Sequence, residues 1–241
     1  MITKSPKRGI ADRILMLRHV TATEVERLRP RILRVRLGGS EITEVRPGQH
    51  IRVKVRENSM VLRTYTVAGI NIRKQWLDLW IYQPSDESTP GLDWSRTVAP
   101  GDPVTFMGPS GRFVVQPDAP YHLVVGEETA QVAFAAILGA TRPGAGVHGV
   151  VEVATPDERL EFSRADELTW TYRGDAPAAE SASLLEAVRA LPLPSVPGVA
   201  YLAGEAKTIA AIRTHLVAER RWPRRSVLTK PFWTPGRKGL D

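Results

Sequence analysis

The chain has 241 residues, enough for one or two domains that each bury a core of their own. It contains no cysteine, which excludes disulfides, iron–sulfur ligation and redox dithiols within the chain, so an electron carrier would have to be a bound cofactor. Lys and Arg number 33 against 26 Asp and Glu, and the net charge of +7 favours an anionic partner such as a nucleotide, an acidic protein or an anionic chelate.

The sequence also lacks the signals of a metal site, a membrane span, a signal peptide and a nucleic-acid-binding surface. The five histidines form no HExxH motif and no close cluster with carboxylates, so no metal site is expected. No apolar run approaches the roughly 20 residues of a membrane span. No signal-like segment follows the basic N-terminus, and a cytoplasmic protein is expected. The basic residues are scattered, without zinc-finger spacing or interleaved aromatic residues, so no nucleic-acid partner is expected.

From about residue 15 to residue 116, the sequence indicates short β-strands separated by turns, the pattern of an antiparallel barrel or sandwich. Glycine and proline mark the turns, because glycine permits positive φ and proline presets the backbone. The turn signals are Gly38-Gly39, Pro47-Gly48, Pro100-Gly101 and Gly108-Pro109. The expected strands cover residues 31–37, 49–55, 61–67, 76–82 and 103–107.

After a break at residues 116–119, strands and helices alternate, which predicts a parallel sheet with crossover helices. The expected strands cover residues 121–125, 149–154, 168–172 and 199–202. The expected helices cover residues 129–138, 183–191 and 206–220. The chain is therefore expected to form two domains, residues 1–117 and 118–241.

The most informative motif is Arg63-Thr64-Tyr65-Thr66, at the end of one expected strand. Arg63 and Tyr65 project from the same face of a strand, because side chains alternate along it. A guanidinium can bind a pyrophosphate with two parallel hydrogen bonds, and a tyrosine ring can stack on an isoalloxazine. Thr66 points to the other face unless the strand bends there. The motif predicts a flavin site, although Arg, Thr and Tyr are also ordinary strand residues.

Two strand-to-helix junctions lie where a parallel sheet places ligands, at the carboxyl ends of its strands. Free amides there could receive a phosphate, but a glycine turn and an acidic first helical turn are also ordinary at a helix start. Neither junction is a GxGxxG loop or a Walker A sequence, so a nicotinamide nucleotide would bind without that fingerprint. The junctions are Val125-Gly126-Glu127-Glu128-Thr129-Ala130 and Ala203-Gly204-Glu205-Ala206.

Taken in order along residues 19–237, these motifs resemble those of the siderophore-interacting, flavin-dependent ferric-siderophore reductases. That family belongs to the ferredoxin–NADP reductase-like superfamily. The matching landmarks are Arg63-Thr64-Tyr65-Thr66-Val67, Pro90 to Ser95 with Trp94, Pro100-Gly101-Asp102, Gly108-Pro109, both junctions, Ile212 to Leu216, and Phe232-Trp233-Thr234-Pro235-Gly236. The resemblance implies a six-stranded antiparallel β-barrel that binds FAD, followed by an α/β domain that binds NAD(P)H.

The resemblance also implies roles for individual residues. Arg63 would hold the FAD pyrophosphate, Tyr65 would stack on the isoalloxazine, and Thr66 with the Val67 backbone would meet the polar edge of the ring. The other expected FAD contacts are Tyr82, Thr89, Pro90, Gly91, Trp94, Ser95 and Thr129. For NAD(P)H the expected residues are Gly126, Gly204 and Glu205. For an anionic ferric siderophore they are Lys54, Arg112, Lys230, Trp233 and Arg237.

The chain departs from the family pattern at three places. Ala68 stands where relatives commonly have arginine, and Tyr82-Gln83 stands where they have histidine and glycine. Residues 230–233, Lys-Pro-Phe-Trp, replace the usual glycine-tyrosine-tryptophan ending. Tyrosine at position 82 can stack or donate a hydrogen bond but cannot carry the positive charge of histidine.

The predicted function is a FAD-dependent ferric-siderophore reductase that takes electrons from NADPH, NADH or a ferredoxin. Outer-sphere electron transfer needs no general acid or base, so no catalytic residue is assigned. Two alternatives remain at this point: a general flavin-dependent NAD(P)H or ferredoxin reductase, and a module that binds a ferric chelate without turnover.

Overall fold

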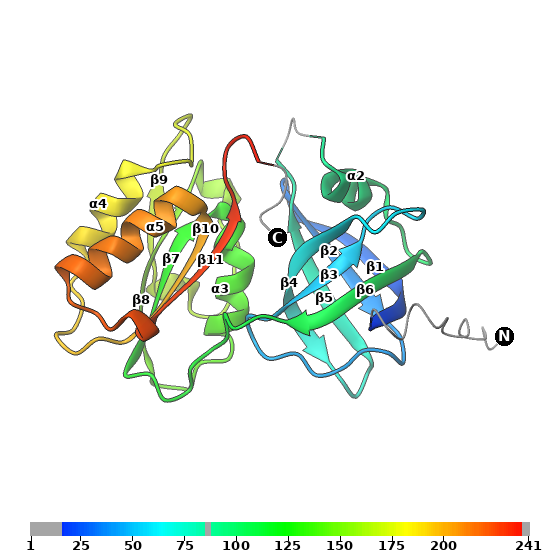
Figure 1. Cartoon of the computed structure of the whole chain (residues 1–241), viewed down its shortest axis with the longest axis horizontal. Helices are drawn as coiled ribbons and strands as arrows, with labels where there is room; N and C mark the ends of the chain where they lie inside the picture. The colour runs from blue at the N-terminus through cyan, green and yellow to red at the C-terminus, as the bar shows by residue number, and fades with distance from the viewer. Residues whose placement is uncertain (1–15, 85–87, 238–241) are drawn as a thin grey trace.

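Six antiparallel strands close the first half of the chain into a barrel. The computed structural model describes residues 16–84 and 88–237. Around the barrel the strands follow the order β1-β2-β5-β4-β3-β6 (Figure 1). Their bounds are β1 Leu17–Arg29, β2 Ile32–Gly38, β3 His50–Lys54, β4 Leu62–Asn71, β5 Trp76–Tyr82 and β6 Pro103–Ser110.

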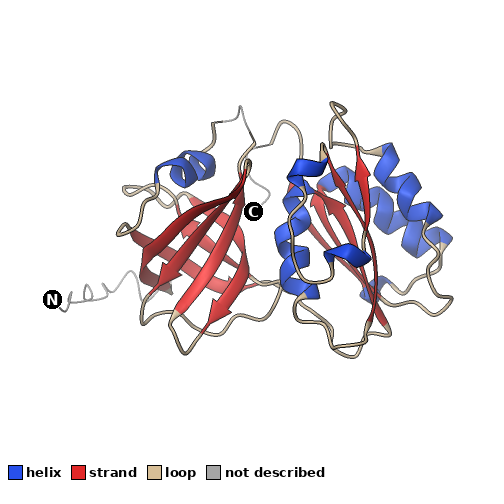
Figure 2. Cartoon of the chain, turned by 180° about the vertical axis from the view of Figure 1, so that it is seen from behind, coloured by secondary structure: helices blue, strands red, loops and turns tan. Residues whose placement is uncertain are grey.

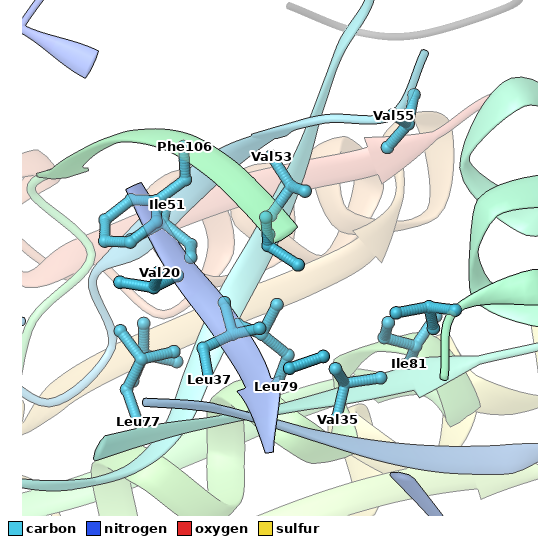
Figure 3. Packing of buried hydrophobic residues seen from close by; sticks show 14 of the residues in the cluster. Val20, Val35, Leu37, Ile51, Val53, Val55, Leu77, Leu79, Ile81 and Phe106 are labelled. Carbon is cyan, nitrogen blue, oxygen red and sulfur yellow. The ribbon is translucent and has the colours of Figure 1, made fainter. Parts of the chain in front are cut away.

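Alternating side chains fill the barrel. Along β3, Ile51 and Val53 are fully buried inside, whereas His50, Arg52 and Lys54, which alternate with them, face outward. Branched and aromatic side chains from all six strands form this core. Figure 3 shows the packing of the cluster, with labels on residues from β1, β2, β3, β5 and β6. Burying each such side chain contributes about 1.5–3 kcal/mol of hydrophobic free energy.

A short helix, α2 (Pro90–Thr97), lies over one end of the barrel (Figure 1). The Thr89 hydroxyl accepts a hydrogen bond from the amide of Leu92, and Pro90 occupies the first helical turn. Both are stabilising at a helix start, because the first amides have no partner within the helix. The helix therefore begins at a fixed place beside β4.

The second half of the chain forms a five-stranded parallel sheet with strand order β11-β10-β7-β8-β9. Helix α3 packs on the sheet face toward the barrel, and α4 and α5 pack on the opposite face (Figures 1 and 2). The strands are β7 Tyr121–Glu127, β8 Gly146–Val153, β9 Thr169–Tyr172, β10 Val199–Glu205 and β11 Val227–Trp233. The helices are α3 Gln131–Leu138, α4 Ala182–Ala190 and α5 Ala206–Thr214, which a π-helical turn at His215–Glu219 extends.

The predicted fold class, an antiparallel barrel followed by a parallel sheet with helices, is confirmed. Strand β5 spans the predicted residues, but two strands were not predicted individually, β1 and β11. Strand β1 has charged residues interspersed among its apolar ones, and much of it faces solvent, which obscures the strand pattern. Strand β11 contains Pro231, which a sheet tolerates here because β11 is an edge strand. Gly108-Pro109 lies within β6 rather than in a turn, since β6 continues to Ser110 and pairs there with His50.

The barrel and the sheet contact each other through an apolar cluster flanked by ion pairs. Ile32 of the barrel packs with Val132 of α3 and with Leu160. At the edge of this contact, Arg29 pairs with Glu161 at 2.6 Å and Arg31 with Glu158 at 2.9 Å. Within residues 16–84 and 88–237, no helix has the length and apolar character needed to cross a bilayer.

Candidate functional site

Strands β4 and β5 separate at one end of the barrel and leave an opening. Strand β4 pairs with β3 along residues 62–66, but its pairing with β5 begins only at Val67, opposite Leu79. Residues Trp80 to Tyr82 of β5 instead pair with β2 alone. The edge of β4 that carries the Arg63–Thr66 motif is therefore accessible to a ligand.

A cavity of about 1000 Å³ begins at this opening and extends to the second domain. Its walls come from β3, β4, β5 and α2 on the barrel side, and from the β7–α3 junction, the β9 loop and β11 on the sheet side. Dinucleotide cofactors need a site near the upper end of the range of ligand pockets, which this volume provides.

Arg63 and Tyr65 line the cavity beside α2. The Tyr65 hydroxyl donates to the carbonyl oxygen of Gly91 at 3.2 Å, and its ring lies 5.7 Å from that of Trp94. Burial raises the pKa of Tyr65. A Cβ atom on Gly91 would lie 2.9 Å from the Tyr65 hydroxyl and 3.0 Å from Cγ of Arg63, so this close approach requires glycine.

Thr66 is buried, and among the described residues its hydroxyl has no hydrogen-bond partner. It also lines the cavity, although its side chain faces away from the barrel core that holds Val67. An unpaired buried hydroxyl is uncommon in a folded protein and marks a place for a polar ligand atom. The Thr66 hydroxyl would suit the polar edge of a flavin, next to the guanidinium of Arg63 and the ring of Tyr65. Val67 can offer only its backbone.

Five residues at α2 that were predicted to contact FAD do not line the cavity: Thr89, Pro90, Gly91, Trp94 and Ser95. The Ser95 hydroxyl donates to the carbonyl oxygen of Leu92 at 2.8 Å and accepts from Gln83 at the same distance. Trp94 packs against the barrel core. Leu92 is the residue of α2 that reaches the cavity.

On the sheet side, a hydrogen-bonded chain of polar side chains borders the cavity. Arg173 forms a two-pronged ion pair with Glu128, and the Tyr82 hydroxyl lies 3.5 Å from the same carboxylate. Arg31 donates to the Tyr82 oxygen at 3.3 Å. Burial and the nearby charge of Glu128 raise the pKa of Tyr82 to about 12. Tyr82 is therefore a neutral donor at physiological pH, where the family pattern has an ionisable histidine.

Thr129 also lines the cavity, and behind it lies a fully buried carboxyl, that of Glu127. Glu127 accepts hydrogen bonds from the Thr129 hydroxyl at 2.5 Å and from the Thr129 amide at 2.8 Å. Burial and the neighbouring Glu128 raise the pKa of Glu127 to about 7.

The three residues predicted to bind NAD(P)H are buried and lie outside the cavity lining. A Cβ atom on Gly126 would lie 2.1 Å from the carbonyl oxygen of Ala203, so glycine allows β7 and β10 to approach. Gly204 has φ of +126°, a backbone conformation that favours glycine. The Glu205 carboxylate accepts from the amides of Lys207 at 3.0 Å and Thr208 at 2.8 Å, so it caps α5.

Cations from both domains face the cavity. Arg52 and Arg112 come from the barrel side, and Lys230 comes from β11. Lys230 donates to Nδ1 of His50 at 2.6 Å and thereby joins β11 to β3. Among the lining residues that the structure describes, the single carboxylate is Glu128, which Arg173 neutralises, so this described lining carries net positive charge.

Lys54 and Arg237, both predicted to bind substrate, do not line the cavity. Arg52, Arg173 and His50 line it but were not predicted. Side chains alternate along β3, so Arg52 and His50 lie on the same face as Lys54. This alternation could have indicated both residues as candidates. Arg173 had no local signal, because its place at the cavity depends on its ion pair with the distant residue Glu128.

Comparison with protein families finds two matches that together span most of the chain. Residues 49–113 match the siderophore-interacting FAD-binding domain, and residues 119–236 match the family model described as siderophore-interacting protein. The first match contains the Arg63–Thr66 motif, and the second contains both strand-to-helix junctions and strand β11.

The chain is also similar to individual proteins and to a solved structure. Ferric vibriobactin reductase ViuB of Vibrio cholerae is 26% identical over 254 residues, covering 90% of this chain and 93% of that protein. An uncharacterised protein of Mycobacterium tuberculosis is 32% identical over 136 residues, which are 53% of this chain and about half of that relative, 48%. The crystal structure of a siderophore utilization protein from T. fusca, 27% identical, superposes with a TM-score of 0.80 over 93% of this chain and 95% of its own.

Proposed function

The chain belongs to the siderophore-interacting protein family, and we propose on that basis that it is a FAD-dependent ferric-siderophore reductase. In this reaction, electrons pass through FAD to Fe(III) held in a siderophore. Fe(II) then leaves, because it binds the hard oxygen ligands of the chelate more weakly than Fe(III) does.

One observation carries the proposal: a single cavity contains both the accessible edge of β4 and a group of cations that the FAD site does not use. Arg63, Tyr65 and Thr66 line this cavity, and so do Arg112 from the barrel side and Lys230 from β11. A flavin and an anionic chelate would therefore occupy adjoining parts of the same space, as electron transfer between them requires.

FAD, when bound, stores a pair of electrons and releases them singly, which links a two-electron donor to ferric iron. The chain's own residues would bind and orient it. Arg63 offers its guanidinium to the pyrophosphate and Tyr65 offers a fixed ring face. Thr66 supplies an unpaired hydroxyl, and Thr129, which lines the cavity from the second domain, would contact the cofactor from that side. Thr89, Pro90, Gly91, Trp94 and Ser95 support this arrangement by fixing α2.

The ferric siderophore is proposed to bind above the flavin through charge. Arg52, Arg112 and Lys230 would meet its anionic groups, and Trp233 would offer an aromatic face. Lys54 and Arg237 would contribute at longer range, as solvated cations near the same anion.

The proposed electron donor is NADPH or NADH, with a ferredoxin as the second candidate because a cationic surface also suits an acidic carrier protein. Thr129 would meet the nicotinamide. Gly126, Gly204 and Glu205 would serve indirectly, by giving the two junctions their shape. Both donor pools are cytoplasmic, and this is the proposed location of the protein.

The test is turnover on matched acceptors. FAD-loaded, desalted protein receives NADPH, NADH or reduced ferredoxin without oxygen, and Fe(II) production from ferric siderophores is compared with electron delivery to an acidic carrier protein. We expect faster turnover on the ferric chelates. Preference for the carrier protein would indicate a general reductase, and a chelate-binding protein that retains no FAD would indicate a binding module.

A further inference from the structure

Two buried polar atoms lie where β4 and β5 separate, the Thr66 hydroxyl and the indole nitrogen of Trp80. Neither has a hydrogen-bond partner among the described residues, and both residues line the cavity. A buried polar atom without a hydrogen bond is destabilising, so two such atoms at one place favour a polar ligand there.

The register places the two side chains on the same side of the opening. Val67 and Leu79 form the last pair between β4 and β5, and both point into the barrel core. Thr66 and Trp80 each lie one residue beyond that pair, and alternation directs both side chains to the outer face, toward the second domain. Both unpaired atoms therefore border the same part of the cavity.

Packing fixes the indole of Trp80. Its ring packs against a buried cluster formed by Ile32 of β2, Val132 of α3 and Leu160. Because the ring is held between the barrel and the second domain, its N–H has a defined direction before any ligand binds. A donor that is already oriented binds its acceptor with little loss of conformational entropy.

We propose that Trp80 is a FAD-binding residue whose indole N–H donates a hydrogen bond to the flavin beside the Thr66 hydroxyl. An indole N–H can only donate, so it requires an acceptor. The pyrimidine edge of a flavin supplies acceptors as carbonyl oxygens and unprotonated ring nitrogens, and the Thr66 hydroxyl suits the same edge. This inference rests on the proposed function, because it requires FAD in the cavity.

A hydrogen bond of this kind would also affect the redox potential of the flavin. Hydrogen bonds strengthen as the acceptor gains negative charge, so a donor at this edge stabilises the reduced, electron-rich form more than the oxidised form. Loss of the indole N–H should therefore make the midpoint potential of the bound flavin more negative.

The test compares Trp80→Phe, which keeps an aromatic ring but removes the donor, with Trp170→Phe. Trp170 is a suitable control because its indole N–H already donates to the carbonyl oxygen of Ala165 at 2.9 Å. We expect Trp80→Phe to bind FAD about three- to tenfold more weakly, the range for one lost hydrogen bond, and to shift the potential to more negative values. Trp170→Phe should change neither quantity.

A second measurement does not depend on a substitution that alters packing. In ¹H–¹⁵N spectra of the wild-type protein, the indole N–H signal of Trp80, assigned by its absence from Trp80→Phe, should move downfield as FAD is added. If the wild type binds FAD while that signal stays in place and Trp80→Phe binds FAD equally well, the inference is wrong and the proposed function stands. If the wild type retains no FAD, both are wrong.

Discussion

The indole N–H of Trp233 donates to the buried carboxyl of Glu127 at 2.8 Å. Trp233 ends β11 and Glu127 ends β7, so this bond joins two strands that are not neighbours in the sheet. Gly204 of β10 lies between them, and a Cβ atom there would approach Oε1 of Glu127 to 2.6 Å. Glu127 thus holds two residues of the cavity wall, Trp233 and Thr129, from behind.

The first prediction concerns stability between about pH 4.5 and pH 7. The pKa of Glu127 is about 7 in the folded protein, above the 4.5 of an exposed carboxyl. In that window the folded state keeps a proton that the unfolded state has lost, so stability falls as pH rises through it, by at most about 1.4 kcal/mol per pH unit. Glu127→Gln is neutral throughout and should lack this decline in urea unfolding measured at several pH values.

For Glu205, the expected change of stability with pH has the opposite sign. Burial acts to raise its pKa, but hydrogen bonds from the amides of Lys207 and Thr208 and from the Thr208 hydroxyl lower it overall. Its stabilising effect is therefore present above about pH 4.5 and is lost as pH falls through the lowered pKa. Glu205→Gln should remove part of the acid-induced loss of stability in the same unfolding experiment. If the difference in unfolding free energy between the wild type and Glu205→Gln grows from pH 5 to pH 7, this assignment is wrong.

The FAD site predicts a large effect at Arg63. Arg63→Ala should weaken FAD binding about 10- to 100-fold, since hydrogen bonds to charged groups contribute about 1.5–3 kcal/mol. Arg63→Lys should recover only part of this, because an ammonium cannot make two parallel bonds to a pyrophosphate. Fluorescence titration with FAD measures both, and the exposed Arg221→Ala is the control. If all three variants bind FAD with equal affinity, Arg63 does not bind the pyrophosphate.

Glycine at position 91 allows a second, steric test. Gly91→Ala would bring a methyl group within 3.0 Å of both Tyr65 and Arg63, so it should displace these side chains and weaken FAD binding severalfold. Gly69→Ala, on the same strand as the motif, meets atoms no closer than 3.8 Å and should leave FAD affinity nearly unchanged. Circular dichroism checks that both variants are folded.

The siderophore site predicts an effect that depends on charge and salt. Arg112 is exposed at the cavity, and Arg112→Ala should raise KM for an anionic ferric chelate at low salt while leaving kcat and the KM for a neutral chelate unchanged. The difference should shrink toward 1 M salt, where charges are screened within about 3 Å. Lys54→Ala, outside the cavity lining, should have a smaller effect.

Local patterns were sufficient to predict most of the fold and the centre of the site. Alternation and turn residues predicted β5 to the residue, and the spacing of Arg63 and Tyr65 placed both on one face. The domain boundary at residues 117 and 118 stays a prediction. Strand β11 was missed because Pro231 argues against a strand unless the strand is known to lie at an edge.

Residues whose position depends on tertiary packing could not be predicted. Arg173 reaches the cavity only because its loop folds back onto Glu128, and Trp80 borders it only because β4 and β5 separate after the Val67–Leu79 pair. No spacing in the sequence encodes either event.

The most direct test of the proposed function is a single turnover without oxygen or external donor. FAD-loaded protein is reduced by light, mixed with an excess of ferric siderophore, and followed by its visible spectrum with a colorimetric Fe(II) chelator. The proposed function predicts recovery of the oxidised flavin bands with about two Fe(II) released per flavin, one for each stored electron. A flavin that stays reduced with the ferric siderophore but is oxidised by oxygen would contradict it.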